Sequence, residues 1–476
     1  MGDQLRWPGA QAIAESFAAT ARYRLGDLDG RVVVAPAGTR DLGSEVAIVV
    51  AIGDWESSAL DECARGSGLT PAFTGTAGLG DAASPRVPVV ILDRWDPRRV
   101  GAAPEGFEVL AIVTAFNECD IVEQLLDRLL DDGIRVHVID NWSTDGTDEL
   151  VAKHAERDAP RVTMERFPAE GPSATFELGA MLRRVEEVAA RSSADWIVHH
   201  DVDEVRESPW EGVSLRDGLW AVDRFGFNAV DHTIVNFRPV DDSFAPGDRL
   251  EDAFGWFEFG ADAGSFRQLK AWRRQPEPVA MAYSGGHDVV FPGRRVFPYK
   301  FLLRHYPIRS QAHGERKVLR ERRDRFDPVE HERGWHVHYD HFDDDASFLG
   351  DPAALLRWDE AEFRRAFLLE RLSGGGLAGN PGITARRDAI ESEFEYLRSE
   401  AGRVEAERKR LELLLAATEQ ARLDAEQERV RLQERADGLQ ASIEEMRGSE
   451  RWRIGGLAVA PVARVRQWFD RNRHHD

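Results

Sequence analysis

Strands and helices alternate along residues 106–345. The run "FEVLAIVTAF" (107–116) is apolar almost throughout, which is the pattern of a parallel strand buried on both faces of a sheet. The next segment, "NECDIVEQLLDRLLDDG" (117–133), has apolar residues at helical spacing and ends in a glycine. Parallel strands are joined by crossover connections, which are usually helices. The alternation therefore predicts right-handed βαβ units and an α/β fold.

The same pattern continues up to residue 203. We expect further strands at "IRVHVID" (134–140), "VTMERF" (162–167) and "ADWIVHHDVD" (194–203), and helices at "STDGTDELVAKHAER" (143–157) and "SATFELGAMLRRVEEVAARS" (173–192). Together these elements predict a mixed, mainly parallel sheet that is flanked by helices.

Polar side chains follow three of the predicted strands, in "VTAFNECD" (113–120), "VIDNWSTDGT" (138–147) and "DVDE" (201–204). In open parallel sheets such strand ends line the ligand crevice, and the helix N-termini beside them favour an anion such as a diphosphate. Asp201 and Asp203 are two residues apart on a strand, so their side chains point the same way. Carboxylate oxygens at that spacing suit Mg²⁺ or Mn²⁺. Taken singly, each segment is also explained by helix capping and turn chemistry.

Three segments together, "TAFNE", "DNWSTDGT" and "DVDE", resemble a family 2 glycosyltransferase of the GT-A fold over roughly residues 107–310. The family has D-D-G-S-T-D-G-T in the second segment, where this chain has Asn141 and Trp142 in place of the second Asp and the Gly. The resemblance implies a nucleotide-sugar-binding domain that transfers a sugar from a nucleoside diphosphate sugar to an acceptor hydroxyl with inversion. It also implies a glycan or lipid-linked acceptor and a role in surface polysaccharide or glycan synthesis.

The resemblance also assigns roles to individual residues. Mn²⁺ or Mg²⁺ would lie on the diphosphate, held by Asp201, Asp203 and, from a late strand, His305. Asp140 would face the nucleobase. The nucleotide pocket as a whole would be lined by Thr114, Ala115, Asn117, Glu118, Asp140, Asn141 and Asp201.

In the family a carboxylate deprotonates the acceptor hydroxyl and lies downstream of the metal-binding acids. Asp288, in "YSGGHDVVFPGRR" (283–295), is the predicted base, and Glu258, in "FGWFEFG" (254–260), is the alternative. His199 precedes the acids, and strand alternation aims it the same way as Asp201; a histidine of the core is the alternative. A basic cluster is predicted to neutralise phosphate charge, and its members are Lys300, Arg304, Arg309, Arg316 and Lys317.

Residues 1–105 are expected to form an accessory α/β region, with strand-like runs at "RVVVAP", "EVAIVVAIGDW" and "VPVVILD". The alternative is an extension packed on the catalytic sheet. Between these runs, "GSGLTPAFTGTAGLGDAASP" (66–85) is rich in small residues and predicts a loop. Residues 106–345 would be the glycosyltransferase domain and residues 346–386 a helical linker region.

Residues 387–447 are rich in Glu, Arg, Leu, Ala and Gln and contain no proline. One heptad position carries mostly apolar residues from Ile390 to Met446, whereas the row four residues later is interrupted by arginines. This pattern predicts a coiled coil that dimerises the chain or binds a partner protein; a single solvated helix is the alternative. The Trp- and Arg-rich tail, 448–476, predicts an amphipathic segment for docking or for peripheral membrane contact.

Composition excludes several classes of function. The formal net charge of −22 gives the chain no general affinity for nucleic acids or anionic lipids. Two cysteines, Cys63 and Cys119, cannot build a disulfide framework, and no secretory signal is evident at the start of the chain. We therefore expect a cytoplasmic protein, peripheral at the inner face of the membrane if the tail binds there. The segment "WHVHYDHFDDD" (335–345) favours a solvated strand and turn over a zinc site.

Two other functions fit parts of the sequence. A non-catalytic module could bind sugar nucleotides or glycans and serve mainly in assembly through the coiled coil. A nucleotidyltransferase would need a glycine-rich loop with a lysine to hold a triphosphate, and the only candidate, "GTAGLG" (75–80), is not followed by a clear helix.

Overall fold

The computed structural model describes residues 31–36, 46–52, 57–77, 87–259, 268–276, 279–323, 325–332, 342–343, 345–366, 422, 426, 429–433, 435–447 and 464–467. It divides the chain into two compact units, Met1–Phe394 and Glu395–Asp476. Among the helices in these ranges, none combines the length and the apolar character needed to cross a bilayer.

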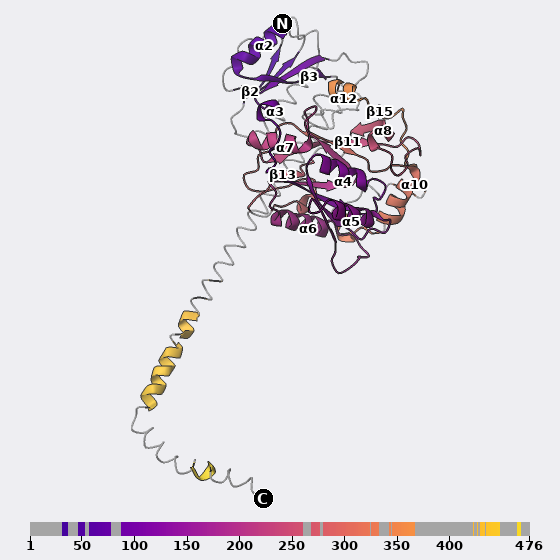
Figure 1. Ribbon diagram of the computed structural model, residues 1–476. Helices are drawn as coiled ribbons and strands as arrows, with labels where there is room; N and C mark the ends of the chain where they lie inside the picture. Colours follow the sequence, from indigo (N-terminus) through magenta and orange to yellow (C-terminus); the bar gives the residue numbers. More distant parts are fainter. Residues whose placement is uncertain are drawn as a thin grey trace. The chain divides into compact units, whose positions relative to one another are not determined.

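The first unit, whose ribbon is drawn in Figure 1, contains a six-stranded sheet. Its strand order is β10-β13-β8-β5-β6-β7. β5 pairs in parallel with both β6 and β8, and β6 pairs in parallel with β7, whereas β13 is antiparallel to β8. The sheet is therefore mixed and mainly parallel, as the sequence predicts. Its strands are β5 (Val109–Ala115), β6 (Arg135–Asp140), β7 (Val162–Arg166), β8 (Trp196–Asp201), β10 (Ala229–Val230) and β13 (Ala271–Arg273).

Helices cover both faces of this sheet. Val109, Ala111 and Val113 of β5 belong to a core that also contains apolar residues of α4 (Val122–Asp131) and α7 (Leu215–Arg224). Leu110 and Ile112 belong to a second core on the opposite face, built with α6 (Leu178–Arg191). β5 is thus buried on both faces, which explains its continuous apolar run. α5 (Thr147–Arg157) packs against α4 and β7.

A five-stranded sheet follows the acidic turn, with the strand order β15-β12-β11-β14-β9. β8 passes through Val202 and Asp203 directly into β9, so this turn joins the two sheets. β14 is parallel to β11 and antiparallel to β9. The strands are β9 (Glu204–Glu207), β11 (His232–Phe237), β12 (Trp256–Phe259), β14 (Phe301–His305) and β15 (Leu356–Arg357).

Short helices connect and follow these strands. α8 (Leu250–Ala253) precedes β12, and a 3-10 turn (Ala282–Ser284) precedes β14. After β14 the chain forms α10 (Gln311–Gly314), a π-helix (Glu315–Arg322), α11 (Pro328–Glu332) and α12 (Glu360–Ala366).

The N-terminal region contains a separate four-stranded sheet with the order β1-β2-β4-β3. Three of its strands coincide with the predicted apolar runs: β1 (Arg31–Pro36), β2 (Val46–Ile52) and β4 (Val87–Asp93). The fourth, β3 (Thr70–Ala77), corrects the predicted loop. Its alternating small residues gave no strand signal, and its antiparallel pairing with β4 forms the strand. Two helices complete the region, α2 (Ser57–Ser67) and α3 (Pro97–Val100).

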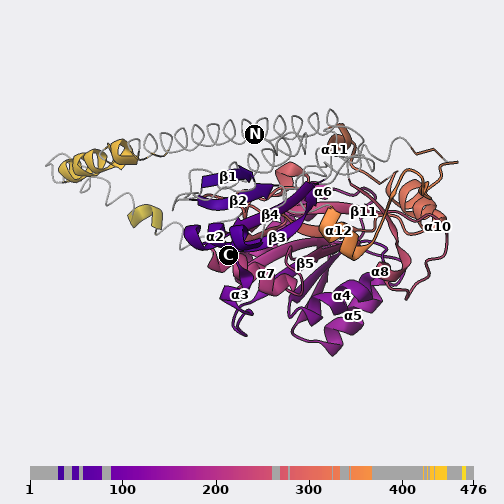
Figure 2. The ribbon, with the colours of Figure 1, turned by 90° about the horizontal axis from the view of Figure 1, so that it is seen from above.

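This N-terminal sheet shares a core with the rest of the first unit. The Trp95 ring lies 5.5 Å from Phe227 and 5.8 Å from Phe297, measured between ring centroids. Phe73 of β3 lies 5.1 Å from Tyr299. α12 packs beside β3, as Figure 2 shows from above. These contacts pack the described part of the N-terminal region against the rest of the first unit, and the role of residues 1–105 as an accessory region stays a prediction.

Asp93 lies at this junction and is fully buried. Its carboxylate accepts hydrogen bonds from the Trp95 backbone N–H, at 2.9 Å, and from the Tyr299 hydroxyl. Burial raises the pKa of Asp93 to about 7, although both hydrogen bonds act in the opposite direction.

In the second unit the described residues are helical, and Leu432, Leu439 and Met446 are exposed. These three residues belong to the predicted heptad row, whose association remains a prediction. Residues 367–386 of the predicted linker, most of the predicted coiled coil and tail, and residues 335–341 of the candidate zinc segment lie outside the described residues.

We expect Asp93→Asn to change how stability depends on pH. Between about pH 4 and 7 the folded chain keeps a proton on Asp93 that the unfolded chain has released, so this group's contribution to stability falls as the pH rises. Urea unfolding at several pH values should show the wild type losing stability relative to the variant across this range. Asp61→Asn, on an exposed part of α2, is the control. A difference between wild type and Asp93→Asn that is independent of pH would contradict the assignment.

Candidate active site

The polar ends of β5, β6 and β8 meet at one edge of the six-stranded sheet. Ala115 is in register with Asp140 on one side, and Thr114 is in register with Asp201 on the other. The parallel register therefore brings together side chains that the sequence separates by 25 to 87 residues. The loops after these strands, including Asn117 and Glu118, lie at the same edge.

Hydrogen bonds join the loop after β5 to the loop after β6. The Asn117 backbone N–H donates to Ser143 Oγ at 3.0 Å, and the Thr144 N–H donates to Asn117 Oδ1 at 2.8 Å. Asn117 has a left-handed φ of 56°, which an asparagine side chain tolerates better than most. The Glu118 N–H donates to Thr147 Oγ1 at 2.9 Å. This bonding fixes the shape of the predicted nucleotide pocket.

Asp140 carries an acceptor atom without a donor. Its Oδ2 accepts the Ser143 N–H at 3.0 Å, whereas its buried Oδ1 has no hydrogen-bond partner among the described residues. Burial raises the pKa of Asp140. Because buried polar atoms are nearly always hydrogen-bonded, this oxygen is suited to a ligand N–H.

Asn141 and Trp142, which depart from the family pattern, connect the predicted nucleotide pocket to the residues that follow β7. Trp142 adopts a left-handed φ of 57°, the conformation that a glycine takes readily. Its indole Nε1 donates to the Pro168 carbonyl at 2.8 Å. Asn141 Nδ2 donates to the Phe167 carbonyl at 2.9 Å, and Asn141 Oδ1 accepts from Arg325 at 3.2 Å.

Both carboxylate oxygens of Asp201 are occupied by protein donors. Thr114 Oγ1 donates to Oδ1 at 2.7 Å, and Lys270 Nζ donates to Oδ2 at 2.9 Å. Lys270 also reaches Glu204, at 3.1 Å. Although burial acts to raise it, the charge of Lys270 holds the pKa of Asp201 well below its usual range. This bonding favours a positioning role for Asp201 at the strand end.

Asp203 and Glu118 share one ammonium group. Lys317 Nζ lies 2.7 Å from Asp203 Oδ2 and 2.8 Å from Glu118 Oε1. Glu118 is also paired with Arg309, whose side chain is fully buried and binds Asp120 through two bonds of 2.7 and 2.9 Å. Burial acts to raise the pKa of Glu118, but the neighbouring cations, first Arg309 and then Lys317, lower it overall. The acids are therefore held ionised by cations from the segment after β14.

His305 faces the remaining oxygen of Asp203. Its Nδ1 lies 2.8 Å from Asn236 Oδ1, an acceptor, so this nitrogen carries the proton. Burial lowers the pKa of His305, which keeps the ring neutral and leaves Nε2 as a lone-pair nitrogen. His305 Nε2 is 3.8 Å from Asp203 Oδ1.

These two lone-pair atoms suit a shared cation. No group of three or more His, Cys, Asp or Glu side chains arranged for a metal occurs within the described ranges. Asp203 and His305 therefore fit a divalent ion only as two protein ligands, with phosphate oxygens and water completing the shell, which is how Mg²⁺ is often bound.

The structure separates the two candidate bases. Asp288 is 2% exposed, and its Oδ1 accepts from Arg294 at 2.7 Å. Glu258 of β12 is opposite Asn236 of β11, which is in register with His305 of β14. Residues opposite one another on neighbouring strands share a face of the sheet, so Glu258 lies in the same row as His305. The Glu258 side chain is 46% exposed. This placement favours Glu258 as the group that can reach an acceptor.

The predicted basic cluster divides in the structure. Arg309 and Lys317 reach the acids of the site, and Arg316 lies 3.5 Å from Asp145. Lys300 and Arg304 instead form ion pairs elsewhere, with Asp231 and Glu207.

His199 is buried, lies 3.5 Å from Thr114 Oγ1, and has its pKa lowered to about 3 by burial.

Sequence reasoning missed three contributors to the site. Lys270 precedes β13, in a stretch without any recognisable motif. Asn236 orients His305 from near the end of β11, an ordinary strand. Arg325 lies over the Phe116 ring at 4.2 Å. The only available signal was the run of basic residues at 316–325, which the predicted cluster covered in part.

One family model matches the part of the chain that forms this edge of the sheet. Residues 110–205 match the family model described as Glycosyl transferase family 2. A solved structure of the mannosyltransferase PcManGT from Pyrobaculum calidifontis, in complex with GDP-Man and Mn²⁺, matches at 24% identity with a TM-score of 0.20. That match covers 29% of this chain and 41% of the other, so the chain spans well under half of that protein's length. No curated protein matches this chain. The resemblance to family 2 glycosyltransferases is thus confirmed over residues 110–205.

Proposed function

We propose that this protein transfers a sugar from a nucleoside diphosphate sugar to an acceptor hydroxyl, with inversion at the anomeric carbon. The family match over residues 110–205 supports glycosyl transfer. The observation that carries the proposal is the alignment of Asp140, Thr114 and Asp201 at one sheet edge, with the Asp203–His305 pair beside it.

The donor would lie across the carboxyl ends of β5, β6 and β8. Asp140 Oδ1 is free to accept an N–H of the nucleobase. Lys317 and Arg322, which lies 3.5 Å from Glu118, are close enough to the acids to exchange some of these contacts for the diphosphate. Such cations stabilise the charge that develops on a diphosphate leaving group.

Asp203 and His305 would hold Mn²⁺ or Mg²⁺. The ion supplies charge neutralisation at the leaving diphosphate. The protein alone offers it little net attraction, because five carboxylates of the described site stand within ion-pair distance of five cations. The acids are Glu118, Asp120, Asp201, Asp203 and Glu204, and the cations are Arg206, Lys270, Arg309, Lys317 and Arg322. We infer that metal and donor bind together, since the diphosphate contributes the missing negative charge.

Glu258 would act as the base. Its carboxylate takes the proton of the acceptor hydroxyl as that oxygen forms a bond to the anomeric carbon. The bond from this carbon to the diphosphate oxygen breaks on the opposite face, and its electron pair leaves with the nucleoside diphosphate. Attack opposite to the leaving group inverts the configuration.

For the C-terminal part of the chain we retain the functions that the sequence predicts. Residues 387–447 would associate as a coiled coil, and the tail would contact a partner or the inner face of the membrane, in the cytoplasm. The alternative function is a non-catalytic sugar-nucleotide-binding module, which the coiled-coil pattern favours. A turnover assay distinguishes this module from an enzyme.

We expect nucleotide and metal to stabilise the protein jointly. A ligand at roughly a hundred times its Kd adds about 2.7 kcal/mol to the free energy of unfolding. A thermal-shift titration with nucleoside diphosphates should therefore show a larger shift with Mn²⁺ present than the sum of the separate shifts. Asp203→Asn should remove only the metal-dependent part, and Asp127→Asn, on the exposed side of α4, should change nothing. If neither the nucleoside diphosphate nor Mn²⁺ shifts the unfolding temperature, the proposed donor and metal site is refuted.

Glu258→Gln should lower turnover by a factor of about 10²–10⁴, the usual contribution of a general base, with donor affinity unchanged. The readout is release of nucleoside diphosphate from a matched donor. Asp288→Asn leaves the partly buried partner Arg294 without its counter-charge, so it should reduce stability while the folded fraction keeps its turnover. Glu211→Gln, at an exposed position, is the control. The opposite pattern, with turnover lost only in a stably folded Asp288→Asn variant, would assign the base to Asp288.

A further inference from the structure

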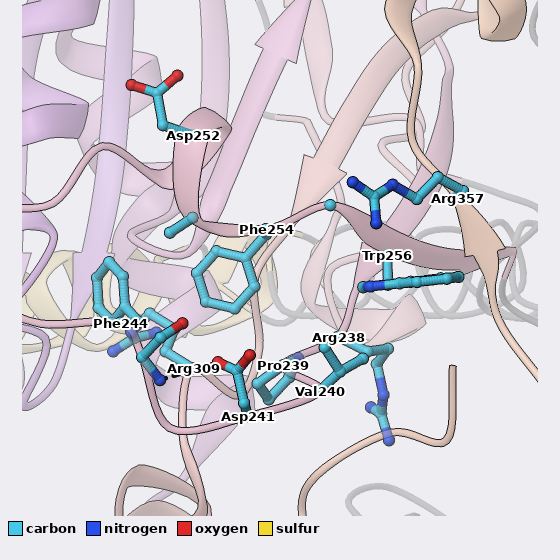
Figure 3. A pocket seen from close by; sticks show the side chains of 13 residues that line it. Arg238, Pro239, Val240, Asp241, Phe244, Asp252, Phe254, Trp256, Arg309 and Arg357 are labelled. Atoms are coloured by element: carbon cyan, nitrogen blue, oxygen red, sulfur yellow. Dashed lines mark hydrogen bonds between the residues drawn. The ribbon is translucent and has the colours of Figure 1, made fainter. Parts of the chain in front are cut away.

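Side chains on the loops of the five-stranded sheet line a cavity of about 190 Å³ (Figure 3). It is formed by the loop after β11, the segment that leads into β12, and Arg309 and Arg357. Arg238, at the start of this loop, lines the cavity, and its Nε is 3.4 Å from Glu258 Oε1. The cavity therefore adjoins the proposed base through Arg238, and Arg309 connects its lining to Glu118 and Asp120 in the loop after β5.

The charges that line this cavity balance. Arg309 is already neutralised by the buried carboxylates that it binds. The remaining charged side chains of the lining are two arginines, Arg238 and Arg357, and two aspartates, Asp241 and Asp252. A phosphate or carboxylate ligand would gain no net attraction from this set. A neutral ligand with many hydroxyl groups can use both kinds of side chain, because hydroxyls donate and accept.

Three aromatic side chains, Phe244, Phe254 and Trp256, contribute to the apolar part of the lining. Trp256 is partly exposed, and the Arg357 guanidinium lies 5.1 Å from its ring centroid. Figure 3 shows Arg357 on one side of this ring. The Arg238 N–H donates to the Trp256 carbonyl at 2.9 Å, which fixes the backbone beneath the indole. A fixed aromatic ring surrounded by donors and acceptors matches a sugar ring, which has an apolar face of C–H groups and a polar rim.

Size limits the ligand. Pockets that bury a drug-sized molecule have volumes of about 300–1,000 Å³. At about 190 Å³ this cavity is smaller, so it fits one ring of a saccharide, with the rest of the molecule outside.

We propose that this cavity binds a neutral saccharide ring of the acceptor and presents its hydroxyl to Glu258. The inference rests on the proposed function, because it places the acceptor for the same transfer reaction. Trp256 and Arg357 would determine which acceptor is used, while the donor site stays independent of them.

Binding of methyl glycosides to the full chain tests this inference. Saturation-transfer NMR would be recorded with the neutral methyl glucoside, galactoside and mannoside, and with methyl glucuronide and glucose 6-phosphate as anionic probes. We expect at least one neutral glycoside to bind and the anionic probes to bind more weakly. Trp256→Ala and Arg357→Ala should weaken binding at least tenfold, and Trp256→Phe should retain most of it. Arg191→Ala, which removes an exposed arginine of α6, is the control.

Three results would overturn the inference: no neutral glycoside binds, the anionic probes bind better, or Trp256→Ala binds as the wild type does. The nucleotide and metal thermal shift, measured on the same samples, separates this failure from failure of the proposed function. If that shift persists while glycoside binding is absent, only the acceptor site is refuted. If glycosides bind but the shift and all turnover are absent, the transfer reaction is refuted and the cavity remains a saccharide site.

Discussion

The ammonium group of Lys317 lies between the carboxylates of Glu118 and Asp203, and the candidate site depends on this contact. Both acids are nearly inaccessible, and an unpaired charge in such a place costs about 3–5 kcal/mol. The loop after β5 and the acidic turn after β8 therefore require the segment after β14 in order to fold as they do. The family match ends at residue 205. The remaining residues of the site, including Lys317, come from the part of the chain that follows the match.

The two sheets divide the chemistry between them. The six-stranded sheet presents Asp140 and Asp201 at the ends of parallel strands, where a nucleotide would lie. The five-stranded sheet presents His305 and Glu258 in one row, where an acceptor would meet the donor. Because β8 continues into β9 through Asp203, a single turn fixes the position of one sheet's groups relative to the other's. The saccharide cavity beside Glu258 extends this division to the acceptor.

Local sequence patterns predicted β5, β6, β7 and β8 and the helices between them, because apolar residues recur along these strands and at helical spacing between them. β5 is the clearest case, with alternate residues in two separate cores. The sequence alone favours Asp288 as the base, whereas the strand pairing that puts Glu258 in a row with His305 joins residues far apart in the chain; the identity of the base stays a prediction. Lys270 was missed for the same reason: its contact with Asp201 joins residues 69 positions apart. The strand β3 was missed because small residues carry no strand signal until a partner strand pairs with them.

The configuration of the transferred sugar tests the central claim most directly. With a matched nucleoside diphosphate sugar and a neutral glycoside acceptor, proton NMR of the reaction mixture reports the anomeric configuration of donor and product. In-line displacement predicts a glycoside product whose anomeric configuration is opposite to that of the donor, together with one equivalent of nucleoside diphosphate. A product that retains the donor's configuration would contradict in-line displacement by the acceptor, and the absence of any product across nucleotide sugars would contradict glycosyl transfer itself.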